Sequence, residues 1–108
     1  MRTVVILNSD SMGHGDADLG RRILGAFLRK CGRLKELEAI VLYNRGVTLL
    51  AEGSPVLADL VTLAEQGVDL LPCGTCVEAL GIELAYGDVS DMDAILTELD
   101  AAEKVITL

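Results

Sequence analysis

Short apolar segments alternate with longer amphipathic ones along the chain, and this alternation constrains the fold more than any other feature. Val, Ile and Leu dominate residues 3–8, 39–43 and 68–71, and each run stops at polar residues or at proline. Between these runs, apolar residues recur every three or four positions, which is typical of helices packed on a sheet. Strands and helices in this order form a mainly parallel sheet covered on both faces, so we expect an α/β fold.

The amphipathic stretches predict where the helices lie. A first helix is expected from Asp16 to Cys31, and a second from a Ser54 cap and Pro55 to Gly67. Further expected elements are a short helix over 74–80 closed by Gly81, a last helix capped by Ser90, a last strand over 104–108 and a short strand over 83–86. Helical spacing places these apolar residues on the inward faces of the first and last helices: Leu19, Ile23, Leu24, Phe27, Leu28, Cys31, Met92, Ile95, Leu96 and Leu99.

Length and hydropathy predict one domain, residues 1–108, without a membrane span. The chain has 108 residues, and its apolar runs are far shorter than the roughly 18 residues of a membrane helix. The first run meets Asn8, Ser9 and Asp10 at once, unlike a secretory signal, so we expect a cytoplasmic protein with no membrane partner. Because 51% of the residues are hydrophobic, we expect further burial between copies in a homo-oligomer.

The charge opposes nucleic-acid binding and is unevenly placed. A net charge of −8 disfavours phosphate neutralisation, and Phe27, Tyr43 and Tyr86 are too few aromatic residues for base stacking. Residues 1–54 carry 8 basic and 6 acidic side chains (+2), whereas residues 55–108 carry 1 and 11 (−10). Two interpretations stay open: complementary faces that help subunits or partners dock, or two solvated surfaces of different sign.

The segment Cys73-Gly74-Thr75-Cys76 is the most distinctive chemical motif, because it follows a strand and opens a helix. Free N–H groups in the first helical turn favour the thiolate of Cys76, which would then be a nucleophile at neutral pH. Gly74 allows close backbone approach, and the Thr75 hydroxyl can cap the helix or hold a bound sulfur species. The alternative is that the two cysteines only pack as small hydrophobic residues.

Other roles for the cysteines have less support. Three cysteines, an odd number, argue against a disulfide framework. A zinc site needs about four ligands, and with His14 and Cys31 as the remaining candidates it could be completed only between subunits. Val77, not His, follows Cys76, which excludes haem attachment. We therefore expect no metal and no cofactor, and an inert core role for Cys31.

Loops after the parallel strands are expected to meet at one edge of the sheet, where ligands of open α/β folds bind. The glycine-rich loop over 13–20 lacks the G-x-G-x-x-G spacing, and its acidic residues would repel phosphate. His14 could exchange protons with the cysteines, or could simply be solvated. The candidate substrate-binding residues are Asn8, Ser9, Asp10, Gly13, His14, Gly15, Asn44, Gly46, Gly74 and Thr75.

Several motifs together resemble a known family. Residues 7–16 (LNSDSMGHGD), 43–47 (YNRGV), 52–54 (EGS), 73–76 (CGTC) and 105–108 (VITL) are similar to the DsrE-like domain of the YedF proteins, sulfurtransferase-like proteins linked to selenium metabolism. The resemblance implies a three-layer α/β/α domain, flavodoxin-like in general shape, with a mostly parallel sheet of four or five strands, commonly assembled into homo-oligomers.

The resemblance also implies a chemistry. Cys76, followed by Val77 and small residues, matches the position that carries sulfur as a persulfide in DsrE/TusD-like proteins. Cys73 matches only the YedF-like pattern, in which it could resolve a persulfide on Cys76 or form a disulfide with it. A TusA-like domain usually precedes the DsrE-like domain in YedF proteins. We therefore expect a separate TusA-like carrier or another persulfide donor as partner.

These observations favour a sulfur or selenium carrier with sulfurtransferase-like persulfide relay through Cys76. The sequence leaves open whether the chain is an enzyme. One alternative is a thiol-disulfide oxidoreductase that uses the C-x-x-C pair, although no Trp accompanies the motif. The other is a non-enzymatic oligomeric binding subunit, which the acidic helices and high apolar content would suit.

Overall fold

A four-stranded parallel sheet forms the centre of the molecule in the computed structural model, which describes residues 2–108. The strand order is β3-β2-β1-β4, and every neighbouring pair is parallel. This confirms the expected α/β class. In chain order the elements are β1 (Thr3–Leu7), α1 (Ala17–Lys30), the 3-10 segment η1 (Cys31–Arg33), β2 (Leu37–Leu42), the 3-10 segment η2 (Asn44–Leu50), α2 (Leu57–Glu65), β3 (Asp69–Pro72), α3 (Gly74–Leu80), α4 (Met92–Ala101) and β4 (Lys104–Thr107).

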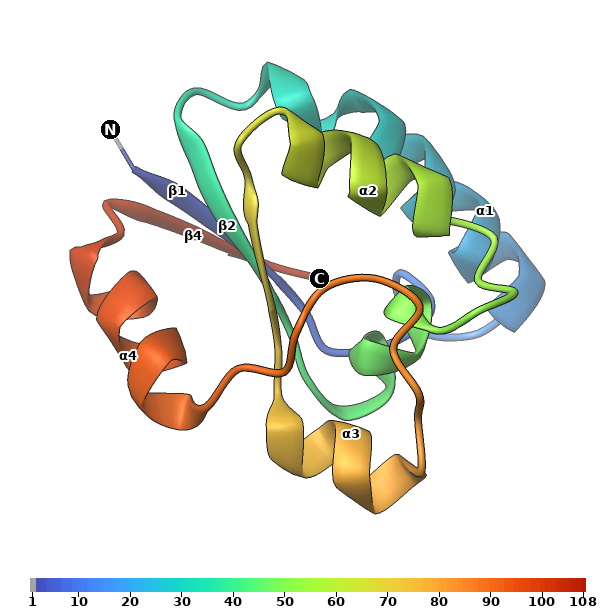
Figure 1. The fold of residues 1–108 in the computed structure, drawn as a ribbon. Helices are drawn as coiled ribbons and strands as arrows, with labels where there is room; N and C mark the ends of the chain where they lie inside the picture. The colour runs from blue at the N-terminus through green and yellow to red at the C-terminus, as the bar shows by residue number, and fades with distance from the viewer. Residues whose placement is uncertain (1) are drawn as a thin grey trace.

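Helices lie on both faces of the sheet, as Figure 1 shows. Helices α1 and α2 cover one face, α4 covers the other, and α3 lies beyond the carboxyl end of the strands. The central strand β1 is buried throughout, and its side chains alternate between the two faces. Val5 and Leu7 join the core under α1 and α2, whereas Val4 and Ile6 join the core under α4.

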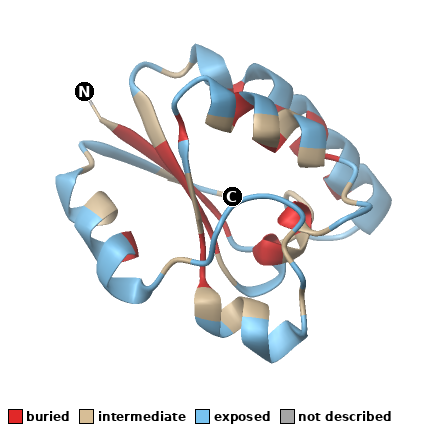
Figure 2. Cartoon of the chain, viewed as in Figure 1, coloured by how far each residue is buried: buried red, intermediate tan, exposed pale blue. Residues whose placement is uncertain are grey.

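The two faces are covered to different extents. Leu24, Leu28 and Leu60 from α1 and α2 are at most 2% exposed, and fully burying each such side chain contributes about 1.5–3 kcal/mol. On the other face α4 contributes a single buried residue, Ile95. Figure 2 shows α4 mostly pale blue, hence exposed, while the central strands are red. The sheet is therefore more thickly covered on the α1/α2 face.

Helical spacing in the sequence predicts more inward-facing apolar residues than the single chain buries. Leu24, Leu28 and Cys31 are buried as expected, and Cys31 belongs to the core. The expectation that Leu19, Ile23, Met92 and Leu96 are buried is wrong, since they are 42–56% exposed. The described chain supplies too little surface to cover them.

Three local expectations are corrected by the structure. Ser54 does not cap α2 but accepts a hydrogen bond from the Val56 N–H in the preceding turn, and Pro55 precedes the helix. Asp91, not Ser90, caps α4 by accepting from the Ala94 N–H. Residues 83–86 form an isolated bridge, Ala51 with Leu84, in place of a strand.

Candidate functional site

The cysteine pair lies where β3 ends and α3 begins. Cys73 occupies the position before the first residue of α3, and Cys76 is in the first turn of that helix. Cys73 is only 7% exposed, whereas Cys76 is partly exposed. All three cysteines of the chain are free thiols. Of the pair, Cys76 is thus the sulfur that a protein-sized or small reactant reaches more easily.

Segment 89–90 lies against the backbone of the pair. The Cys73 N–H donates to the Leu42 carbonyl, and the Gly74 N–H donates to the Ser90 carbonyl at 2.9 Å. A Cβ on Gly74 would come within 3.0 Å of that carbonyl oxygen, which is tighter than almost all real contacts. Close backbone approach therefore favours glycine at position 74, as the sequence suggested.

The loop after β2 reaches Cys76 through its backbone. The Asn44 N–H donates to Cys76 Sγ at 3.0 Å, and Asn44 has a positive φ of 51°, which few residues other than glycine and asparagine adopt readily. Two residues on, a Cβ at Gly46 would overlap the carbonyl oxygen of Leu7 at the end of β1. The segment that holds Asn44 against Cys76 is thus fixed by an obligatory glycine.

The two thiols have pKa values that move in opposite directions. Burial alone would raise the pKa of Cys73. Hydrogen bonds from the backbone and thiol of Cys76 and from the backbone and hydroxyl of Thr75 outweigh burial, so that this pKa lies below its usual value. The Cys73 side chain nevertheless makes no capping hydrogen bond of good geometry with the helix. Burial raises the pKa of Cys76; the Asn44 N–H lowers it, while hydrogen bonding to Cys73 and the negative charge there raise it further.

These directions differ from the expectation that the helix start favours the thiolate of Cys76. The N–H groups of the first helical turn act on the residue that precedes the helix, so Cys73 and not Cys76 becomes the thiolate first. The hydrogen bond between the two thiols and the negative charge on Cys73 hold the pKa of Cys76 above its usual value. The pair consists of an accessible thiol, Cys76, beside a buried sulfur, Cys73, that ionises more readily and can accept a hydrogen bond from that thiol.

The loop after β1 lines a separate cavity on the other side of the same sheet edge. Its volume is 500 Å³, and it lies where β1 and β4 end, the point at which the strand order reverses. Neither Cys73 nor Cys76 lines it. The lining residues are Asn8, Ser9, Ser11, Gly13, His14, Gly15, Ala17, Thr107 and Leu108.

Ion pairs join the two loops. Asp10 Oδ2 lies 3.8 Å from Arg45 Nη2 and 3.9 Å from Arg21 Nη2, so the loop after β1 is tied both to the loop after β2 and to α1. Arg45 directly follows Asn44, whose N–H contacts Cys76. Asp10 therefore connects the cavity side to the cysteine side, although both pairs are partly exposed and contribute at most about 1 kcal/mol each.

The predicted site residues thus fall into two groups. The structure brings Asn44, Gly46, Gly74 and Thr75 together with the cysteines, and it places Asn8, Ser9, Gly13, His14 and Gly15 around the cavity, with Asp10 between the groups. Sequence reasoning did not assign Arg45, Thr107 or the segment 89–90 to the site. The negative charge of Asp10 in the sequence could have indicated a basic partner such as Arg45. The contacts of Thr107 and segment 89–90 depend on tertiary structure alone, so no local pattern indicates them.

Within residues 2–108, no three His, Cys, Asp or Glu side chains gather closely enough to hold a metal ion. The same part of the chain contains no helix with the length and apolar character needed to cross a membrane.

A parallel α/β domain with a cysteine pair at the carboxyl edge of its sheet is the class that fold and site define. The whole chain, residues 1–108, matches the model of the DsrE/DsrF-like family, and the chain belongs to this family, which is associated in general with sulfur relay. None of the curated proteins matches the sequence. The resemblance to the YedF group remains a prediction.

Solved structures show the same fold at low sequence identity. The ychN protein from E. coli is 20% identical, with a TM-score of 0.69 and full coverage of both chains. MTH1491 from Methanobacterium thermoautotrophicum, a protein of unknown function, is 22% identical, with a TM-score of 0.72 over 99% of this chain and 98% of that one. BT1422 from Bacteroides thetaiotaomicron, also of unknown function, is 23% identical, with a TM-score of 0.63 over 98% and 94%.

Proposed function

We propose that this protein is a sulfur carrier with sulfurtransferase-like activity, in which Cys76 holds the transferred sulfur as a persulfide. The observation that carries the proposal is the arrangement of the pair: a partly exposed thiol that receives the Asn44 N–H and shares its proton with a buried sulfur of lowered pKa. Family membership supports a role in sulfur relay.

In the loading step, the Cys76 thiol gives its proton to the Cys73 thiolate and attacks the terminal sulfur of a donor persulfide, R–S–SH. A bond forms between Cys76 Sγ and that sulfur, and the S–S bond of the donor breaks. The donor leaves as the thiolate R–S⁻ and takes up the proton held on Cys73. The sum is R–S–SH plus Cys76–SH giving R–SH plus Cys76–S–SH, with no net oxidation.

In the unloading step, an acceptor thiolate attacks the terminal sulfur of the Cys76 persulfide and the Cys76 thiolate leaves. The Asn44 N–H stabilises that leaving thiolate, as an N–H donor stabilises charge that develops during a reaction. Loop 44–46 shields the adduct, and a TusA-like carrier or another persulfide is the donor. We extend the same chemistry to selenium in place of sulfur.

The test of this cycle uses the full-length protein and intact mass spectrometry. After incubation with a small persulfide donor and desalting, the protein should carry the mass of one added sulfur atom, and a small acceptor thiol should then remove it. Protein that gains no sulfur, or that keeps it in the presence of excess acceptor, contradicts the proposal.

A thiol-disulfide oxidoreductase is the second candidate, and the lowered pKa of Cys73 at a helix start favours it. An oxidoreductase would reduce an insulin-like disulfide with multiple turnovers, and Cys73→Ser and Cys76→Ser would both abolish this activity. A sulfur carrier would show no such turnover. A non-enzymatic binding subunit, the third alternative, would keep its partner with both cysteines replaced by Ser.

A further inference from the structure

The surface beside the cysteine pair has exposed apolar side chains. Val89 is 57% exposed and lies against the start of α3, since a Cβ on Gly74 would be 3.6 Å from Val89 Cβ. Leu80, one helical turn after Cys76 on α3, is 38% exposed. Exposed apolar groups with a polar rim are typical of interaction sites.

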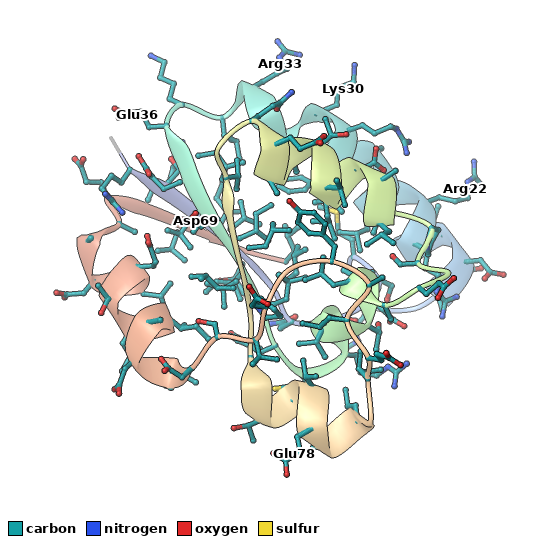
Figure 3. All side chains as sticks on the ribbon, viewed as in Figure 1. Arg22, Lys30, Arg33, Glu36, Asp69 and Glu78 are labelled. Carbon is teal, nitrogen blue, oxygen red and sulfur yellow. The ribbon has the colours of Figure 1, made fainter. Side chains whose placement is uncertain are left out.

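The chain that forms this surface carries only acidic charge. Residues 72–93 contain no Lys, Arg or His, and their acidic members are Glu78, Glu83, Asp88, Asp91 and Asp93. Glu78, Glu83 and Asp88 are exposed, and no basic side chain within residues 2–108 pairs with them. Glu78 extends from α3 away from the sheet, as Figure 3 shows, so it faces an approaching partner.

The nearest basic residues do not offset this charge. Arg45 follows Asn44, whose N–H contacts Cys76, but Arg45 Nη2 already lies 3.8 Å from the carboxylate of Asp10. Lys104, the one basic residue within residues 55–108, begins β4 and therefore lies at the opposite edge of the parallel sheet. The surface next to Cys76 thus keeps an excess of negative charge.

We infer that the exposed surface beside Cys76 docks a basic protein, which exchanges sulfur with that cysteine. We call Leu80, Val89, Glu78 and Asp88 the docking surface. The inference rests on the proposed function and names the kind of partner: a protein whose reactive cysteine lies on an exposed segment with Lys or Arg beside an apolar residue. Donor and acceptor use the same surface, because in both steps the partner's sulfur approaches the sulfur on Cys76.

Charge favours such a partner over a small anionic thiol. Acidic groups repel a free thiolate that carries carboxylates, whereas opposite charge raises the rate of encounter by about 10-fold to 10³-fold at low salt. Neither Cys73 nor Cys76 lines the 500 Å³ cavity or the 610 Å³ groove along α1. Recognition at Cys76 therefore depends on the docking surface.

The same basic residues would assist the transfer itself. Lys or Arg beside a cysteine lowers the pKa of its thiol, so the docked partner presents a thiolate. That thiolate attacks the terminal sulfur of the Cys76 persulfide, and the bond from Cys76 Sγ to that sulfur breaks. The sum is R–S⁻ plus Cys76–S–SH giving R–S–SH plus Cys76–S⁻, with no net oxidation.

The test uses three synthetic peptides of equal length as stand-ins for the partner. Each has one Cys and one Leu, and the remaining residues are all Lys, all Glu or all Ser. The Cys is activated as a mixed disulfide with thionitrobenzoate, which Cys76 releases as a coloured thiolate when it attacks the peptide sulfur. Each rate is divided by the rate of 2-mercaptoethanol with the same peptide, and the rate of Cys76→Ser is subtracted as background.

The Lys peptide should react about tenfold or more faster than the Glu peptide, with the Ser peptide between them. High salt should reduce this ratio to about twofold or less by screening. Glu78→Lys combined with Asp88→Lys should remove or reverse the preference. Val89→Ser should slow the Lys peptide by a few fold.

The matched control is Asp69→Lys. Asp69 is exposed and begins β3, at the end of the strand away from the cysteines (Figure 3). This variant makes a charge reversal outside the docking surface and should keep the preference, and circular dichroism confirms that each variant folds. Equal rates for the Lys and Glu peptides, or a preference that survives Glu78→Lys with Asp88→Lys, overturns the inference.

This assay separates the docking surface from the sulfur-carrier proposal, because no persulfide takes part in it. A preference for the Lys peptide in a protein that takes no sulfur from a persulfide donor would support the docking surface and contradict the carrier. Sulfur loading of Cys76 without any charge preference among the peptides would do the reverse.

Discussion

The carboxyl edge of the sheet has two halves that differ in how firmly the backbone is held. On the β2–β3 half, Gly46 and Gly74 allow backbone segments to lie in direct contact, and the cysteines and Asn44 occupy this half. On the β1–β4 half, Gly13 and Gly15 have open space around them and line a 500 Å³ cavity. The reactive groups are therefore on the rigid half, and the space for a ligand is on the open half.

The largest effect should come from adding one methyl group to the rigid half. In Gly46→Ala, the new Cβ would overlap the Leu7 carbonyl oxygen, and since the obstacle is backbone, the loop must move away from Cys76. We expect a loss of about 3 kcal/mol or more in the free energy of unfolding, measured by urea denaturation.

The matched change in the open half is Gly13→Ala. An added Cβ there meets no atom within 4 Å, and only the positive φ of 80° opposes it. We expect a loss of about 1 kcal/mol. If the two variants lose equal stability, the contrast between the halves is wrong.

Asn44 should be the next most sensitive position. Asn44→Val places a β-branched side chain at a φ of 51°, which should cost about 1–3 kcal/mol and displace the N–H from Cys76 Sγ. Asn44→Gly keeps the backbone conformation and is the control. Urea denaturation gives the stability, and the half-life of the Cys76 persulfide reports the lost hydrogen bond. Equal stability and half-life in the two variants would show that the backbone of Asn44 has no role.

The pH dependence of Cys76 should respond to Cys73. The hydrogen bond to Cys73 and the negative charge there raise the pKa of Cys76, so Cys73→Ala removes both causes and that pKa should fall. The alkylation rate of Cys76 by iodoacetamide follows its thiolate fraction, and its midpoint should therefore move to lower pH in the variant. Peptide mass spectrometry separates Cys76 from Cys31. A midpoint that stays or rises would contradict the coupling.

The smallest effect is expected from His14→Ala on the open half. His14 is exposed and lines the cavity, which the cysteines do not. Sulfur loading of Cys76 should therefore proceed at the wild-type rate within about twofold, and transfer to an acceptor should slow by a few fold at most. A loss of loading by a hundredfold would place His14 in the chemistry of the cysteine pair.

The sequence predicted the α/β class and the cysteine motif because both depend on local patterns. Apolar runs, helical spacing and the Gly81 stop at φ 64° are encoded within a few residues. Prediction from the sequence failed where contacts between segments far apart in the chain determine the local structure. Asp91 replaces Ser90 as a cap because Ser90 is bridged to Cys73. The directions of the two cysteine pKa shifts have a local cause instead, since Cys73 and not Cys76 directly precedes the helix. Helical periodicity also did not show that Ile23 and Leu96 stay exposed.

The most direct test of the central claim locates the sulfur adduct on the chain. Wild type, Cys73→Ser and Cys76→Ser are incubated with one persulfide donor, and their intact and peptide masses are compared. Cys76→Ser should carry no added sulfur, while Cys73→Ser should keep a measurable fraction on Cys76, because Cys73 accepts the proton and does not hold the sulfur. Sulfur on Cys73 in Cys76→Ser, or equal loading of all three proteins, would contradict the assignment of Cys76 as the carrier.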